Sequence, residues 1–174
     1  MGKVPYANVV GSLMYFMVCT RPNIAYAVSI VSMYLANPGK HHWEAVKWIL
    51  KYLKGTADAG QVYGRDQGKH VDVDGFIDAD NAKDPDKGRS ITRYVFMVHG
   101  CVVSWKATLQ HVVALSTVEA EYMVLTEAVK ESIWLKEIKV AKIGTKDNAA
   151  DAFTKVVPGS KFKYCMEILG VGIN

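Results

Sequence analysis

Hydrophobic positions recur at helical spacing through the first third of the chain. We expect three helices there, over about Tyr6–Val18, Thr20–Ala36 and Lys40–Lys54. Thr20 is the expected N-terminal cap of the second helix and Pro22 lies in its first turn. Gly55 follows the third helix at a position that often ends helices. The first third is therefore predicted to be an α-helical segment.

The pattern changes after Gly55, and the sequence becomes β-rich beyond a connection. A polar, glycine-rich connection, GQVYGRDQGK, is the candidate boundary. Two β-rich runs meet at His99-Gly100, which predicts an antiparallel hairpin. The other expected elements are a strand at Val71–Ala79, a helix at Thr117–Ile138, a strand at Lys139–Ile143 and a helix from about Asn148. We predict an α+β fold, with a mixed sheet of about four strands and flanking helices after the helical segment.

Length and composition fit one moderate domain, or one small domain with an appendage. The 174 residues are half hydrophobic and carry a net charge of +4, which permits an anionic partner without requiring one. Cys19, Cys101 and Cys165 are far apart and lack metal-ligand spacing, so a reducing compartment fits. The N-terminal apolar run is interrupted by polar residues and lacks the features of a leader. We expect an intracellular protein, cytoplasmic or nuclear, that is not secreted and has no membrane partner.

An acidic pattern marks the first predicted strand. Asp72, Asp74, Asp78 and Asp80 occupy alternate positions, so their side chains share one face of an extended strand. Four like charges repel one another and are costly to bury unless a positive group lies among them. Neither acidic pair has the spacing of an EF-hand calcium loop.

Three more acidic positions further along the chain have a candidate role. Ser116 and Glu119 have the spacing of a capping box, which gives Glu119 a structural role. Glu121 lies one turn before Leu125, beside the apolar face of the helix, where a solvated charge is less expected; an ordinary surface glutamate is the alternative. Asp151 lies in the first turn of the last predicted helix, where the helix dipole by itself favours a carboxylate.

Lysines form a stripe on the third predicted helix. Lys47, Lys51 and Lys54 follow one another at helical spacing, with Trp43 and Trp48 nearby. Such a stripe can bind along the phosphate backbone of a nucleic acid. The alternative is an ordinary solvated helix face without a partner.

Segments in all parts of the chain resemble the Pol polyprotein of copia-type LTR retrotransposons. The segments NVVGSLMYFMVCTRPNIAYAVSIVSMYL and HWEAVKWILKYLKGT resemble the end of reverse transcriptase. The motifs FIDAD, VALSTVEAEY and DNAADAFTK, in this order, resemble the ribonuclease H domain. The resemblance implies a helical reverse-transcriptase thumb or connection remnant over residues 1–58, and a truncated ribonuclease H-like domain over residues 69–174.

The resemblance also implies a chemistry for the acidic positions. Ribonuclease H enzymes bind two divalent cations between four carboxylates and hydrolyse the RNA strand of RNA–DNA hybrids. Hard oxygen ligands and a phosphate substrate suit Mg²⁺ or Mn²⁺. Position by position, Asp78, Glu121 and Asp151 match three of the four metal ligands. Asp80 belongs to the motif but is not among these implied ligands.

The chain departs from the family at the remaining ligand. ESIWLKEI runs straight into KVAKIGT, so a strand–helix crossover of roughly thirty residues or more is missing, together with its carboxylate. Arg93 stands where the family usually has glycine. We therefore expect cleavage to be very low or absent, and an exposed sheet edge that invites self-association. A non-catalytic nucleic-acid-binding module and a translated remnant without a selected role are the alternatives.

Overall fold

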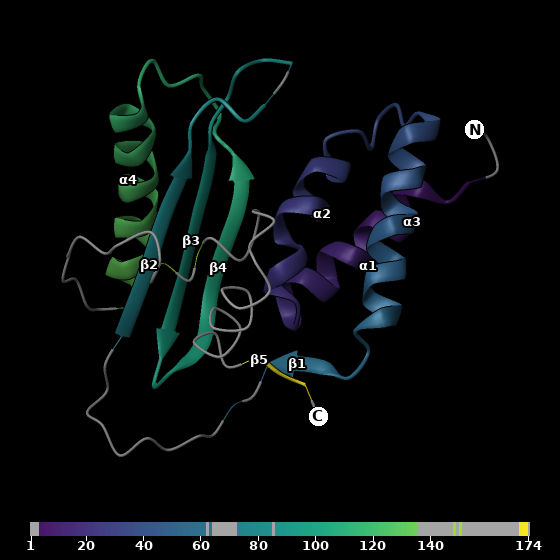
Figure 1. The fold of residues 1–174 in the computed structure, drawn as a ribbon, viewed down its shortest axis with the longest axis horizontal. Helices are drawn as coiled ribbons and strands as arrows, with labels where there is room; N and C mark the ends of the chain where they lie inside the picture. Colours follow the sequence, from purple (N-terminus) through teal and green to yellow (C-terminus); the bar gives the residue numbers. More distant parts are fainter. Residues whose placement is uncertain are drawn as a thin grey trace.

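The computed structural model describes residues 4–61, 63, 73–84, 86–135, 148, 150 and 171–173. Helices and strands both contribute to it, which confirms the α+β class (Figure 1). The helices are α1 (Tyr6–Cys19), α2 (Ala25–Ser32), α3 (Lys40–Gly55) and α4 (Thr117–Leu135), with a 3₁₀ turn at Pro22–Ile24 before α2. The strands are β1 (Ala59–Gln61), β2 (Val73–Asp80), β3 (Ile91–Val98), β4 (Cys101–Leu109) and β5 (Val171–Ile173).

The first three helices pack around one hydrophobic core. Its buried members are Tyr6, Val10, Leu13, Ile24, Val28, Val31, Val46 and Ile49. The second helix differs from the prediction, because Thr20 does not cap it. The hydroxyl of Thr20 donates to the carbonyl of Phe16 at 3.4 Å and so closes α1 instead. A 3₁₀ turn then precedes α2, which ends at Ser32.

The main sheet of the described residues is antiparallel, with strand order β2-β3-β4. The predicted hairpin at His99-Gly100 is confirmed, and these two residues have φ angles of 50° and 72°. Positive φ at both turn positions is typical of a two-residue hairpin whose twist matches that of its strands. The strand expected at Lys139–Ile143 lies outside the described residues, as does most of the last predicted helix. The sheet is therefore antiparallel with three strands as far as the structure describes it, where the sequence predicted a mixed sheet of about four.

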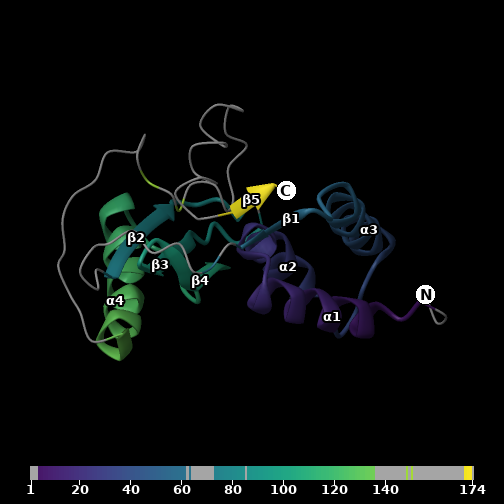
Figure 2. The ribbon, with the colours of Figure 1, turned by 90° about the horizontal axis from the view of Figure 1, so that it is seen from below.

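Side chains alternate between two faces of this sheet. Tyr94 and Phe96 form a core with Ala128 of α4. Val95 and Met97 point to the opposite face and form a core with Ala25 of α2. Two views agree that α4 and the N-terminal helices lie on opposite sides of the sheet (Figures 1 and 2). Because α2 borders both the helical core and the sheet core, the helical segment is packed on the sheet part rather than loosely tethered to it.

Two short features complete the described structure. β1 pairs antiparallel with β5, with Ala59 opposite Ile173, and overlaps the start of the stretch that the sequence suggested as a connection. The capping box of α4 is present in a modified form. The amide of Glu119 donates to the Ser116 hydroxyl at 3.1 Å, and the Glu119 carboxylate accepts from the amide of Leu115 at 2.6 Å.

Candidate functional site

A buried arginine lies among the acidic side chains of β2. Arg93 on β3 is directly opposite Asp78 in the antiparallel register. Its guanidinium forms an ion pair with the Asp78 carboxylate and a second one, at 2.9 Å, with the Asp80 carboxylate. The side chain of Arg93 is 0% exposed, and those of Asp78 and Asp80 are 20% and 12% exposed. The three residues form a unit that we call the Arg93 triad.

The Arg93 triad explains why carboxylates occur on a largely covered face. Asp78 and Asp80 lie two positions apart on one strand and point the same way, so they repel each other without a cation between them. The guanidinium is that cation. It forms ion pairs with both carboxylates, and a buried charge needs such partners. Asp74 on the same strand is exposed, and Asp72 lies outside the described residues.

More charged and polar groups surround the triad. The Arg89 guanidinium donates to the Asp84 carboxylate at 2.8 Å, and this bond is the main cause of the lowered pKa of Asp84. Tyr26 of α2 has a raised pKa, first because it is partly buried and then because of the negative charges of Asp84 and Asp80. The positive charge of Arg93 acts in the opposite direction on the pKa of this phenol. The charges of Asp84, Asp80 and Arg93 thus all act on the Tyr26 phenol.

Asn148 contacts β2, the strand that carries Asp78 and Asp80, from far along the chain. The Asn148 side-chain amide donates to the main-chain carbonyl of Ile77 at 2.8 Å, across 71 positions of sequence. The amide of Ala150 donates back to the Asn148 side chain at 3.1 Å. Ala150 is 0% exposed and belongs to the same core as Val95 and Met97, on the triad face of the sheet. Asp151 itself lies outside the described residues.

Glu121 has a different position. It is exposed on α4, which covers the sheet face opposite to the Arg93 triad. Among the described residues, no group of three or more His, Cys, Asp or Glu side chains is placed to hold a metal ion. The convergence of Asp78, Glu121 and Asp151 therefore stays a prediction. The described side chains do not fit a pair of divalent cations, because the Asp78 and Asp80 carboxylates are both engaged by a guanidinium.

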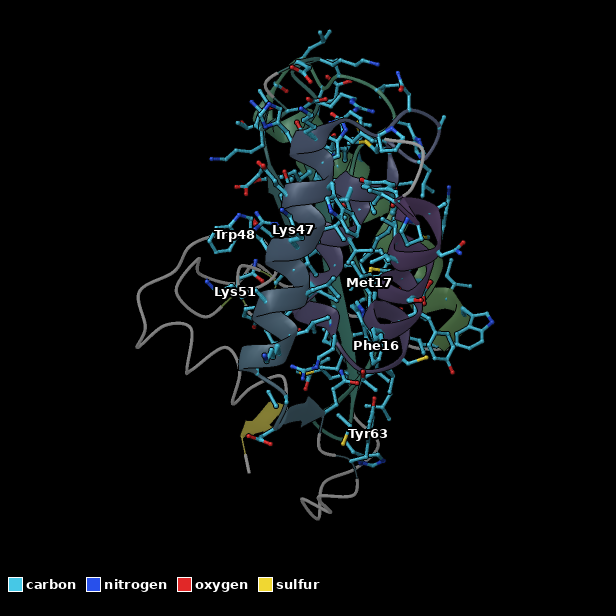
Figure 3. The ribbon with its side chains drawn as sticks, turned by 90° about the vertical axis from the view of Figure 1, so that its right-hand side faces the viewer. Phe16, Met17, Lys47, Trp48, Lys51 and Tyr63 are labelled. Carbon is cyan, nitrogen blue, oxygen red and sulfur yellow. The ribbon has the colours of Figure 1, made fainter. Side chains whose placement is uncertain are left out.

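The lysine stripe lies on an exposed face of α3. Lys47, Lys51 and Lys54 are all exposed, and Figure 3 shows Lys47, Trp48 and Lys51 on the same side of the helix. Trp48 is 66% exposed, and the Lys51 ammonium lies 4.9 Å from the centre of its ring. Trp43 does not join them, because it packs against the helical core beside Tyr6.

In the sequence, Arg93 stands out only as a departure from a family pattern. A usable signal was present, since an arginine in the middle of a β-rich run is expensive to bury without acidic partners, and a run of alternate aspartates precedes it. The pairing of Asp84 with Arg89 gave no comparable signal, because both residues lie in a polar loop.

Comparisons with known proteins identify relatives along the whole chain. It is 42% identical to the retrovirus-related Pol polyprotein from transposon TNT 1-94 of Nicotiana tabacum, over 226 residues that include 100% of this chain and 17% of that protein. It is 42% identical to the secreted RxLR effector protein 161 of Plasmopara viticola over 135 residues, which are 78% of this chain and 94% of that protein. The retrovirus-related Pol polyprotein from transposon RE2 of Arabidopsis thaliana is 35% identical over 130 residues, 75% of this chain and 9% of that protein. No family model and no solved structure matches the chain.

The chain therefore belongs to the family of retrovirus-related Pol polyproteins from transposons, and it corresponds to a fragment of such a polyprotein. It spans a small part, 17% and 9%, of the tobacco and Arabidopsis polyproteins. The aligned stretch of the tobacco relative exceeds the 174 residues of this chain by 52. Within the ranges that the structure describes, no helix combines the length and apolarity needed to cross a membrane.

Proposed function

We propose that the chain corresponds to the end of reverse transcriptase and the ribonuclease H region of a copia-type Pol polyprotein. In this proposal it keeps a ribonuclease H-like arrangement but has lost cleavage of RNA in RNA–DNA hybrids. The order β2-β3-β4-α4 supports the arrangement, since the resemblance implies this order of elements. The contact of Asn148 with Ile77 supports it as well, because it brings the segment before Asp151 to the strand that carries Asp78.

The observation that carries the loss of cleavage is the Arg93 triad. The first implied ligand, Asp78, is paired with a fully buried guanidinium, and a divalent cation would need the same carboxylate oxygens. Two cations of like sign repel strongly at close range in a partly dry site. The 52-residue excess of the tobacco relative agrees with the loss of the strand–helix crossover that carries another ligand. One ligand is then engaged and another is missing.

A cleavage assay tests this part of the proposal. The purified chain is incubated with a labelled RNA–DNA hybrid in Mg²⁺ or Mn²⁺, beside an Asp78→Asn variant and a blank without protein. We expect the three reactions to be equal within error. Robust metal-dependent cleavage that disappears in Asp78→Asn would overturn the proposed loss of activity.

The α3 face supports a remaining role in binding nucleic acid. Three exposed lysines, Lys47, Lys51 and Lys54, follow one line on the helix, and Trp48 offers an exposed ring beside them. Lysines bind phosphates through charge, whereas an exposed aromatic ring stacks on bases. The partner proposed for this face is an RNA–DNA hybrid or another nucleic acid.

Fluorescence anisotropy with a labelled hybrid tests the binding role. Replacing Lys47, Lys51 and Lys54 together with alanine should weaken binding. It should also reduce the slope of log affinity against log salt concentration by roughly 0.7–0.9 for each phosphate that the variant no longer neutralises. Lys130→Ala is the matched control, because Lys130 lies on α4, away from α3. Equal affinity of the triple variant and the wild type, or affinity that does not change with salt, would contradict the binding role.

A further inference from the structure

Arg93 is enclosed more completely than a surface ion pair requires. It is 0% exposed and is among the largest fully buried side chains of the described residues. Its neighbour across β3 and β4 is Ala107, which is 1% exposed. Ala25 of α2 belongs to the core on the same face. Arg93 is thus flanked by a small residue on β4, and its side chain reaches across to the carboxylates of β2.

We propose that the guanidinium of Arg93 takes the place of a divalent cation in the charge balance of Asp78 and Asp80. The folded chain then needs no metal ion at these carboxylates and gains no stability from one. This inference stands on the ion pairs and burial of the described residues, and it does not require the chain to bind nucleic acid.

A guanidinium that is part of the chain differs from a metal ion in two properties, its permanence and its fixed geometry. An arginine stays protonated throughout the pH range in which proteins fold, and its planar fork pairs with carboxylates in a fixed geometry. A metal ion is in exchange with solvent and is removed by a chelator, whereas the guanidinium is part of the chain. A cation that displaced Arg93 from Asp78 would also leave a fully buried positive charge with fewer acceptors. Displacement is therefore unfavourable.

The inference predicts how stability responds to metal ions. The thermal midpoint of the wild type should be the same in EDTA, Mg²⁺ and Mn²⁺. Arg93→Met keeps a long side chain and removes its charge, so the two carboxylates lose the guanidinium that lies between them. Its midpoint should fall in EDTA and recover in part when Mn²⁺ is added, because the carboxylates become available as oxygen ligands.

A triple variant separates charge from packing. Asp78→Asn, Asp80→Asn and Arg93→Met together remove all three charges of the triad. We expect this variant to be more stable in EDTA than Arg93→Met alone and to show no response to Mn²⁺. The triple variant can still be measured if Arg93→Met alone does not fold, because removing the repulsion between the carboxylates should restore folding. A triple variant as unstable as the single one would refute the charge explanation and assign the effect to packing.

Thermal melts followed by circular dichroism measure these midpoints, and a Mn²⁺ titration read by electron paramagnetic resonance measures binding directly. Wild type that shows neither a shift of the midpoint nor bound Mn²⁺ at this site supports the inference. Wild type that is stabilised by Mn²⁺, with the effect lost in Asp78→Asn, overturns it. Both measurements are made without nucleic acid, so the cleavage and hybrid-binding assays can fail while this inference holds. Mn²⁺ bound at Asp78 in the wild type would overturn this inference and would also remove the support that the Arg93 triad gives to the loss of cleavage.

Discussion

Replacing Gly75 with alanine tests how closely β2 and β3 pack. Gly75 is directly opposite Phe96 in the antiparallel register. A Cβ atom added at Gly75 would lie 2.5 Å from Cε1 and 2.8 Å from Cδ1 of the Phe96 ring. Ordinary contacts between carbon atoms are about 3.5–4.0 Å long, so the ring has to move by roughly 1 Å. It has little room, since Phe96 is 5% exposed and its ring centre lies 5.6 Å from that of Tyr94.

The magnitude follows from two opposing effects. Forcing an extra carbon against a tightly packed ring costs about 1–3 kcal/mol. Replacing glycine also lowers the entropy of the unfolded chain, which stabilises the fold by about 0.4–1 kcal/mol where the backbone conformation allows it. The overpacking is the larger effect, so we expect Gly75→Ala to lower the free energy of unfolding by about 1–2 kcal/mol.

Gly11→Ala is the matched control. Gly11 lies inside α1, and nothing lies within 4 Å of a Cβ added there. The same chemical change should therefore stabilise the protein by about 0.5–1 kcal/mol through helix propensity. Urea unfolding followed by circular dichroism measures the free energy of unfolding of both variants, analysed with the same dependence on urea concentration. If Gly75→Ala is as stable as the wild type while Gly11→Ala gains stability, the Phe96 ring does not lie over Gly75 and the reasoning is refuted.

Three more predictions concern single residues. Tyr6→Phe removes the bond from the buried hydroxyl to the Val31 carbonyl, 2.8 Å long, and should lower the free energy of unfolding by about 0.5–1.5 kcal/mol in the same urea experiment; an unchanged midpoint would contradict it. Ser116→Ala removes the cap of α4 and should cost about 0.5–2 kcal/mol, whereas Ser116→Asp, which keeps a capping oxygen, should cost less. Burial, followed by the charges of Glu131 and Glu127, raises the pKa of Tyr94 from 10.0 to about 12. The unfolded phenol thus loses its proton first, and stability should stay level below pH 10 and decline towards pH 12. An ultraviolet titration in which Tyr94→Phe removes no late-titrating phenol would refute this assignment.

The sequence by itself determined the features that depend on neighbouring residues. The hairpin at His99-Gly100, the cap at Ser116 and the existence of α1, α3 and α4 all follow from residues within a few positions of one another. The motifs by themselves also indicated the family. Alternation along β2 likewise placed Asp78 and Asp80 on one face. These predictions needed only backbone geometry and local hydrogen bonding.

Only the tertiary structure decided what lies against that acidic face. Arg93 meets Asp78 because the register of β2 and β3 joins positions 15 apart in sequence, and Asn148 meets Ile77 across 71 positions. The rotation of α4, fixed by the burial of Ala120, Val124 and Ala128, leaves Glu121 exposed. Such contacts depend on the simultaneous packing of several elements, since the energy of a buried charge is set by whatever reaches it in space. A local pattern is therefore enough to show that Asp78 and Asp80 need a positive partner, but not that the partner is Arg93.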